Sequence, residues 1–202
     1  ELALMFAAER KVKVELLVVP VEGWRRGATW DRTGLVWINP SPNMRSLMQA
    51  MLYPGVGLLE FSNLSVGRGT DTPFEIIGAP WTEPRDLAAS LNAAQVPGVR
   101  FIPVRFTPTA SRFANQECGG VQLHVVNRNA LAPVELGLTL ACTLRKLYPE
   151  TWEAEKMDRL LRHAAVLAAI RRGVPAPELR DLYESDLKRF RERRKEFLLY
   201  ER

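Results

Sequence analysis

The chain has 202 residues, of which 47% are hydrophobic and 25% are charged, so we expect a globular protein with one sizeable buried core. The longest apolar stretches, such as residues 16–21, are the length of a strand, and no membrane span is expected. The net charge of +5 is not gathered into one basic stripe, because the densest run, residues 189–195, includes Glu192. We therefore predict a mixed-sign surface and expect no nucleic acid as partner.

The chain opens with an amphipathic pattern and no initiator methionine. Residues 2–10 have the apolar spacing of a helix, and residues 12–21, rich in Val and Leu, predict a strand. The opening lacks the basic start and the long apolar core of a signal peptide. We expect the chain to be a piece of a longer protein.

A helix is predicted after a proline-rich turn. The two prolines of residues 39–43, NPSPN, exclude a regular element there. Apolar positions between residues 44 and 52 then follow helical spacing, with Asn43 as the expected N-cap. Pro54 is expected to end this helix, and residues 56–59 predict a short strand.

Residues 60–81, EFSNLSVGRGTDTPFEIIGAPW, hold the densest group of polar side chains in the sequence. Glycines alternate with them, and a glycine permits positive φ and a close approach of the backbone to a ligand. A polar loop of this kind between apolar segments more often carries function than packing. The segment predicts a binding loop.

The sequence then returns to regular elements. Pro84 is suited to the first turn of a helix that runs to about residue 95. Residues 99–106 predict a strand, in which Pro103 indicates an edge position or a bulge, and residues 120–127 predict another.

The remainder of the sequence is helical in pattern. Residues 134–148, 157–172 and 177–200 have helical apolar spacing. The sequence as a whole predicts an α/β protein: a mixed small sheet with flanking helices and a helical C-terminal tail from about residue 133.

Neither a metal site nor a cofactor is expected. The chain has two cysteines, Cys118 and Cys142, and two histidines, His124 and His163, which are too few for a Cys- or His-rich metal site. Cys142 lies in an apolar helical pattern and is interpreted as a small core residue. For His124 the preferred interpretation is a structural histidine on a strand face, and a place in the binding site is the alternative.

Five segments together resemble one family of glycosidases. They are WINPSPN at residues 37–43, the loop at 60–81, FTPTASRFANQECGGVQLHV at 106–125, MDRL at 157–160 and FRERRKEFLLY at 190–200. In this order they resemble the NamZ-like, or YbbC-like, exo-β-N-acetylmuramidases. These enzymes remove terminal N-acetylmuramic acid from peptidoglycan fragments. The resemblance covers nearly the whole chain and concerns the C-terminal portion of the family.

The resemblance implies a division of labour between two parts of a longer protein. Residues 1–22 would be the end of a preceding Rossmann-like domain, and residues 23–202 a C-terminal α/β substrate-binding domain. Family members carry a Pro-Glu-His-Gly motif upstream as the usual catalytic candidate, and this sequence contains no such motif. The resemblance therefore implies that the fragment alone is inactive, and that its partners are a peptidoglycan-derived sugar and the N-terminal half of the same protein.

The resemblance also implies roles for residues of the loop at 60–81. Arg68 would bind the lactyl carboxylate, because a guanidinium matches a carboxylate in two places. Asn63, Ser65 and Thr70 would bond hydroxyl or acetamido groups. The substrate-binding candidates are Glu60, Asn63, Ser65, Arg68, Gly69, Thr70 and Glu75, with Asn43 and His124 as weaker ones.

The two carboxylates of the loop have open roles. Either Glu60 or Glu75 could be a second carboxylate of the reaction, but for Glu75 a structural pairing with Arg68 is preferred. The structural alternative for Arg68 is an ion pair with one of these two residues. Phe61 stands where the family commonly has glycine, and Arg112 where it commonly has lysine, which bears on substrate preference.

Two further expectations follow. A non-catalytic carbohydrate-binding or interaction module for cell-wall fragments is the alternative to a part of an enzyme, because the sequence shows no catalytic pair. Peptidoglycan as substrate implies an extracytoplasmic location, periplasmic or secreted.

Overall fold

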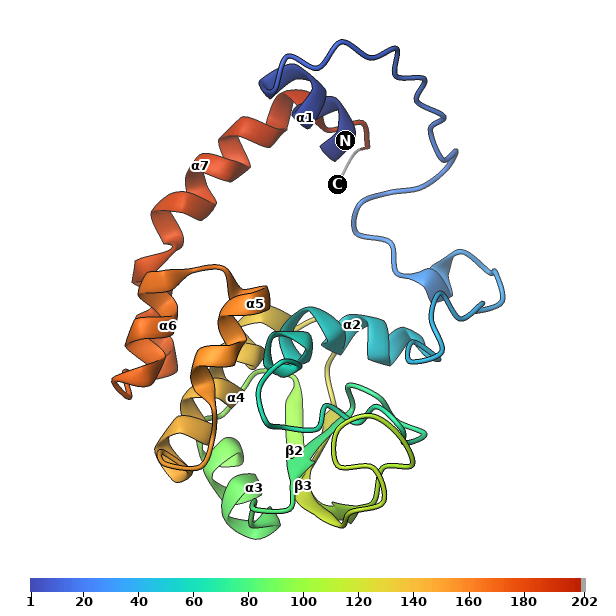
Figure 1. Cartoon of the computed structure of the whole chain (residues 1–202). Coiled ribbons are helices and arrows are strands. Elements are labelled where there is room, and N and C mark those ends of the chain that lie inside the picture. Colours follow the sequence, from blue (N-terminus) through green and yellow to red (C-terminus); the bar gives the residue numbers. More distant parts are fainter. Residues whose placement is uncertain (201–202) are drawn as a thin grey trace. The chain divides into compact units, whose positions relative to one another are not determined.

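The computed structural model describes residues 1–200 and divides into two compact units (Figure 1). One unit comprises Trp37–Leu182. The other comprises Glu1–Val36 together with the C-terminal residues from Tyr183 onward. The polar loop at residues 60–81 lies within the first unit.

A three-stranded antiparallel sheet forms the centre of the first unit. Its strands are β1 (Ile76–Ala79), β2 (Val99–Phe106) and β3 (Cys118–Val125), in the order β1-β3-β2. The prediction of an α/β protein with a small sheet and flanking helices is confirmed. Pro103 lies on β2, an edge strand of this sheet. An edge strand pairs with a neighbour on one side only, so it tolerates a proline, which lacks a backbone N–H.

Helix α3 (Pro84–Ala93) forms as predicted, with Pro84 in its first turn, and it packs against β2 and β3. Leu87 and Leu91 are fully buried on the face that it turns inward. The side-chain amide of Asn92 donates to the carbonyl of Phe101 at 2.8 Å and accepts from its N–H at 3.1 Å. This pair of hydrogen bonds attaches the end of the helix to the edge strand.

Helix α2 (Leu47–Val56) differs from the prediction at both ends. Its N-cap is Ser46, whose hydroxyl accepts from the N–H of Gln49 at 3.2 Å, and not Asn43. The helix continues through Pro54, and Gly57–Leu59 form a 3₁₀ turn instead of a strand. Pro54 lies in the last turn, where it costs one backbone hydrogen bond, and packing on a neighbouring helix outweighs that loss.

The neighbouring helix is α4 (Pro133–Leu147), and two glycines allow it to approach α2 closely. A Cβ on Gly55 would lie 1.8 Å from the carbonyl oxygen of Pro133, and a Cβ on Gly137 would lie 2.4 Å from that of Gly55. Only glycine fits at this crossing, so α2 extends to Gly55 because packing requires it there.

The last part of the first unit is helical but interrupted. A 3₁₀ turn at Ala154–Met157 leads into α5 (Asp158–Leu161) and α6 (Ala164–Arg171), where one helix was predicted. The break lies at Arg162, which adopts a left-handed conformation with φ of 48°. His163 then caps α6, since its Nδ1 accepts from the N–H of Val166 at 3.3 Å.

The 3₁₀ helix Ala176–Leu182 closes the first unit.

The second unit contains α1 (Leu2–Glu9), a 3₁₀ turn at Trp30–Arg32, α7 (Glu184–Arg194) and a 3₁₀ turn at Lys195–Phe197. The predicted first helix is confirmed. The predicted strand at residues 12–21 is wrong for this structure, because no strand of the described residues pairs with it. Its apolar side chains are largely exposed there.

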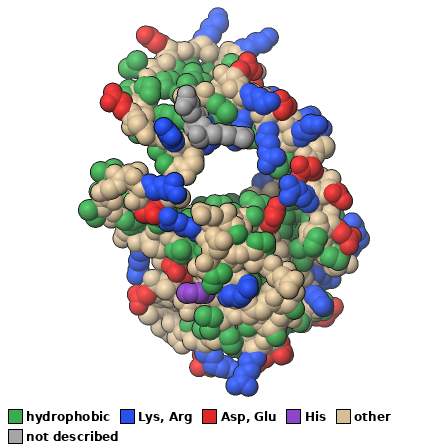
Figure 2. Space-filling view, turned by 180° about the vertical axis from the view of Figure 1, so that it is seen from behind, with side chains coloured by type: hydrophobic (Ala, Val, Ile, Leu, Met, Phe, Trp, Pro, Cys, Tyr) green, Lys and Arg blue, Asp and Glu red, His purple; other side chains and the backbone are tan. Residues whose placement is uncertain are grey.

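Helix α7 carries both basic and acidic side chains, as predicted. Arg189 pairs with Asp186, and Lys195 pairs with Glu192 at 2.6 Å. Arg193 bonds Glu9 of α1 through Nε at 2.7 Å. On the face shown in Figure 2, Lys and Arg side chains likewise lie among Asp and Glu side chains. Among residues 1–200, no helix has the length and apolarity needed to span a bilayer.

Candidate functional site

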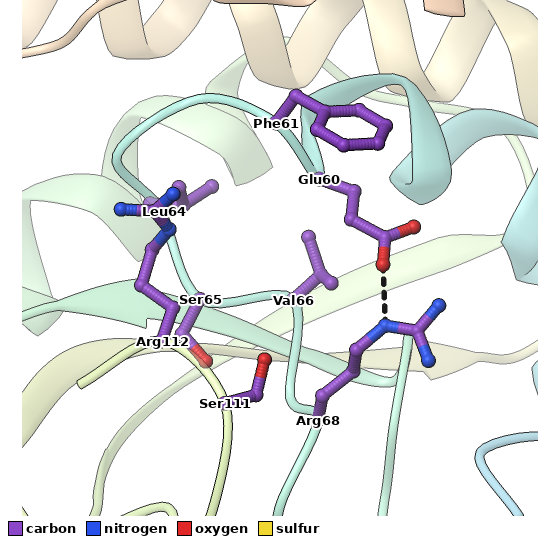
Figure 3. Close-up of a pocket in the computed structure, with 8 residues that line it drawn as sticks. All are labelled: Glu60, Phe61, Leu64, Ser65, Val66, Arg68, Ser111 and Arg112. Atoms are coloured by element: carbon purple, nitrogen blue, oxygen red, sulfur yellow. Dashed lines mark hydrogen bonds and ion pairs between the residues drawn. The ribbon is translucent and has the colours of Figure 1, made fainter. Parts of the chain in front are cut away.

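Two loops of the first unit enclose a cavity of about 430 Å³ (Figure 3). One loop belongs to the segment at residues 60–68, and the other connects β2 to β3. The cavity is lined by Glu60, Phe61, Leu64, Ser65, Val66, Arg68, Ser111 and Arg112. Three of the predicted binding residues, Glu60, Ser65 and Arg68, therefore lie at one site.

Backbone contacts hold the first loop against the sheet. Ser65 forms a bridge with Gly78 of β1, with N–H···O distances of 2.8 and 3.0 Å. Gly67 has φ of +80°, and a Cβ there would lie 2.6 Å from the Ile76 side chain. The loop therefore follows a path that requires glycine, and this path sets the positions of Ser65, Val66 and Arg68.

A second glycine, Gly69, joins the two loops. The carbonyl of Gly69 accepts from the N–H and the hydroxyl of Thr109, at 2.8 and 2.9 Å. A Cβ on Gly69 would lie 2.4 Å from the carbonyl oxygen of Ala110. Because the loops touch here, the position of Arg68 is coupled to that of Ser111 and Arg112.

The loop between β2 and β3 contains three residues other than glycine with positive φ. They are Ser111 at 67°, Phe113 at 61° and Asn115 at 60°. Residues that carry a side chain rarely adopt a positive φ, so the surrounding structure must hold the loop backbone in place. Such strain is concentrated at functional sites, and here it positions Ser111 at the cavity.

An ion pair between Glu60 and Arg68 forms one wall of the cavity (Figure 3). The Nε of Arg68 donates to Oε1 of Glu60, and the two side chains are 29% and 21% exposed, respectively. The guanidinium also lies 5.2 Å from the ring centroid of Phe74. Among the described residues, the two terminal nitrogens of Arg68 and Oε2 of Glu60 have no hydrogen-bond partner. Three polar groups thus remain available to a ligand.

The opposite wall carries a second cation. In the view of Figure 3, Arg112 lies across the cavity from Glu60 and Arg68. Its side chain is exposed and has no ion-pair partner among residues 1–200. Two arginines and one glutamate leave the cavity with an excess positive charge, while Leu64 and Val66 provide apolar surface. This combination suits a polar organic anion.

Two predicted binding residues of the loop bond protein atoms instead of lining the cavity. Asn63 donates to the carbonyl of Thr151 and accepts from the N–H of Glu153, both at 2.8 Å. Thr70 donates its hydroxyl to the carbonyl of Gly67 at 2.7 Å. These hydrogen bonds hold the loop in shape.

The prediction that Glu75 pairs with Arg68 is wrong, because Glu60 takes that place. Glu75 accepts from the side-chain amide of Gln49 at 3.1 Å and from the hydroxyl of Ser46 at 3.5 Å. It therefore connects β1 to the start of α2.

The two weaker candidates lie outside the set of cavity-lining residues. Asn43 belongs to the turn before α2, and its N–H bonds the hydroxyl of Ser41 at 3.3 Å. His124 is exposed on β3, opposite Arg100 of β2 in the register.

Sequence reasoning noted Phe61 and Arg112 only as departures from the family pattern, and both line the cavity. It missed Ser111, Leu64 and Val66. Ser111 belongs to a polar run that follows a predicted strand, which was a usable signal, whereas an apolar side chain such as Leu64 or Val66 in a loop is equally suited to the core.

Both cysteines are free thiols, and burial controls their chemistry. Burial raises the pKa of Cys118 to about 11, with a further contribution from the Glu117 carboxylate. Burial also raises the pKa of Cys142 to about 11. Both thiols therefore stay protonated at neutral pH and cannot act as nucleophiles there. Among residues 1–200, no group of three or more Cys, His, Asp or Glu side chains could hold a metal ion.

These pKa values predict slow thiol labelling. At pH 7.5 the native protein should react with a disulfide reagent about 100-fold more slowly than the protein unfolded in urea, because the unfolded thiols ionise near pH 9. Because the thiols ionise near pH 9 in the unfolded protein and near pH 11 in the native protein, the free energy of unfolding should fall as the pH rises from 9 to 11. Absorbance of the released reagent measures the rates, and equal rates would contradict the burial of the thiols.

Comparisons with known proteins agree with one another. Residues 51–200 match the family described as "Exo-beta-N-acetylmuramidase NamZ, C-terminal", and residues 1–48 match "Exo-beta-N-acetylmuramidase NamZ, N-terminal". The chain is 37% identical over 203 aligned residues to the peptidoglycan beta-N-acetylmuramidase NamZ of Bacillus subtilis strain 168, covering 99% of this chain and 49% of that protein.

Two solved structures are similar as well. Both are DUF1343 family proteins of Bacteroides fragilis NCTC 9343. One has a TM-score of 0.87 and 30% identity, and the other a TM-score of 0.71 and 26% identity. Each comparison covers 99% of this chain and, respectively, 55% and 54% of the other.

The fold and the matches place the chain within a family of glycoside hydrolases. It belongs to the NamZ family of exo-β-N-acetylmuramidases. It spans about half the length of the relatives that it matches.

Proposed function

We propose that this chain is the C-terminal, substrate-binding part of an exo-acting glycoside hydrolase that releases terminal N-acetylmuramic acid from peptidoglycan fragments. The observation that supports this most directly is the Glu60–Arg68 pair, which presents two unpartnered guanidinium nitrogens at a cavity with excess positive charge. Muramic acid differs from other common amino sugars by a lactyl group, which carries a carboxylate. A guanidinium binds such a group through two parallel hydrogen bonds.

In this proposal the remaining polar groups bind the sugar itself. Oε2 of Glu60 accepts from a sugar hydroxyl, and Ser65 and Ser111 offer hydroxyls of their own. Gly69 holds the two loops together, and Asn63 and Thr70 keep the first loop in shape. Glu75 accepts from the side-chain amide of Gln49, and in this proposal it connects β1 to α2.

The catalytic acid lies outside this chain in our proposal. Hydrolysis of a glycoside generally needs two groups, usually a pair of carboxylic acids on either side of the bond. Glu60 is the one carboxylate among the residues that line the cavity, and it is already engaged with Arg68. We propose that the N-terminal half of the same protein supplies the acid, and that residues 1–22 are the end of that half. The match to the N-terminal family description covers residues 1–48, which supports placing residues 1–22 in that half and continues beyond residue 22.

We further propose that the protein acts outside the cytoplasmic membrane, where peptidoglycan is found. The competing function is a carbohydrate-binding module without activity. It draws support from the same cavity, because binding alone requires no second carboxylate.

An activity assay separates the two functions. The full-length protein should release the chromophore from a chromogenic β-glycoside of N-acetylmuramic acid, and the 202-residue chain alone should release none above the uncatalysed rate. The matching glycoside of N-acetylglucosamine serves as the control substrate and should be a poor one. Absence of turnover by the full-length protein would favour the binding module, and turnover by the isolated chain would contradict an acid supplied from elsewhere.

A further inference from the structure

Phe61 is a half-buried aromatic residue at the edge of the cavity, and its neighbours hold its backbone in place (Figure 3). Ser62, which is fully buried, donates to the carbonyl of Leu59 at 2.7 Å and accepts from the indole N–H of Trp152 at 3.1 Å. On its other side, Glu60 is fixed by its ion pair with Arg68. The Phe61 ring therefore projects from a rigid stretch of chain.

One side of the Phe61 ring is covered by a cation. The guanidinium carbon of Arg159, from α5, lies 4.4 Å from the ring centroid, which is cation–π geometry. Arg159 is not among the residues that line the cavity, whereas Phe61 is. Arg159 therefore contacts the ring without being one of the residues that line the cavity.

A phenylalanine ring offers a ligand no hydrogen bond, so its contribution to this cavity must be apolar. Its faces carry partial negative charge and attract the partially positive C–H groups of a ligand. A pyranose presents such C–H groups on its ring face and hydroxyls around its rim. Phe61 stands beside the Glu60–Arg68 pair, so apolar and hydrogen-bonding surfaces adjoin, as this ligand requires.

We propose that Phe61 is the platform on which the pyranose ring of the bound sugar stacks, and that Arg159 is a positioning residue that holds the platform. This assignment rests on the proposed function, since it takes the ligand of the cavity to be a sugar. In this proposal two residues of the site determine specificity. Arg68 binds the carboxylate of the ligand, and Phe61 contacts the face of its sugar ring.

Binding by the full-length protein tests the proposal, with affinities measured by titration calorimetry. Phe61→Leu keeps an apolar side chain and removes the aromatic face, and it should weaken the binding of N-acetylmuramic acid about 5- to 10-fold. Phe61→Tyr keeps the ring and should bind within about twofold of the unchanged protein. Arg159→Met should produce a smaller loss than Phe61→Leu. Phe6→Leu, an exposed phenylalanine of α1, is the matched control and should bind as the unchanged protein does.

Two sugars separate this proposal from the role of Arg68. N-acetylglucosamine has the same ring and lacks the lactyl group, so Phe61→Leu should weaken the binding of both sugars by the same factor. Unchanged affinity of Phe61→Leu for N-acetylmuramic acid would overturn the stacking platform and leave the proposed function standing. Absence of binding by the unchanged protein would overturn both. An equal loss in Phe61→Tyr and Phe61→Leu would also overturn the platform, because the ring is retained in the first.

Discussion

Replacement of Arg68 by alanine in the full-length protein should weaken the binding of N-acetylmuramic acid about 10- to 100-fold, the loss expected for charged hydrogen bonds. The two terminal guanidinium nitrogens have no partner among the described residues, so a carboxylate would be their first. Arg68→Lys keeps the charge but not the planar fork, and it should recover only part of the affinity. Titration calorimetry measures all three proteins.

Two controls distinguish a ligand-binding arginine from a structural one. N-acetylglucosamine lacks the carboxylate, so Arg68→Ala should change its affinity little. Arg105 forms a more exposed ion pair with Glu117 at 3.1 Å, and neither residue lines the cavity, so Arg105→Ala should bind both sugars normally. Unchanged affinity of Arg68→Ala for N-acetylmuramic acid would show that Arg68 serves only to hold Glu60.

Replacement of Gly55 by alanine should lower the free energy of unfolding by about 3 kcal/mol or more, among the larger effects of a single substitution. The new Cβ would lie 1.8 Å from the carbonyl oxygen of Pro133, and backbone atoms cannot move aside as a flexible side chain can. Helices α2 and α4 would have to separate. Because α2 leads through the turn Gly57–Leu59 to Glu60, the cavity should be disturbed as well.

Urea unfolding followed by circular dichroism measures this effect. Gly27→Ala is the control, because nothing lies within 4 Å of a Cβ at Gly27, and its free energy of unfolding should stay within about 0.5 kcal/mol of the unchanged protein. A similarly small change in Gly55→Ala would contradict the close crossing of α2 and α4.

Elements with a strong local signal were predicted well. Strand β2 spans Val99–Phe106, as the alternating pattern indicated, and α3 begins at Pro84. Helix α4 spans Pro133–Leu147, within one residue of the prediction at each end. In each case the signal used for the prediction, either the spacing of apolar residues or a proline at the helix start, belongs to the element itself and does not depend on its neighbours.

Elements whose limits depend on packing were predicted less well. Pro54 and Gly55 are ordinary stop signals, yet α2 passes through them because Gly55 fits against α4. Residues 12–21 have a strand pattern, but a strand forms only where a neighbour completes its hydrogen bonds, and none of the described strands does so.

Part of the candidate site was predictable from local sequence, and part depended on packing. The segment at residues 60–81 was identified from its own composition, and it supplies Glu60, Ser65 and Arg68 to the cavity. Ser111 and Arg112 arrive from the loop between β2 and β3, which meets the first loop through Gly69 and Thr109.

The sequence by itself determined the α/β class, the polar loop and the resemblance to a family of glycosidases. The apolar periodicity indicated the class, the local composition indicated the loop, and the motifs carried the resemblance. Only the tertiary structure decided that Arg68 pairs with Glu60, that Glu75 and Asn63 turn to other partners, and that Arg112 faces the same cavity. The physical reason is that a side chain bonds whichever group folding brings within about 3 Å of it. That neighbour is set by the packing of segments distant in the chain.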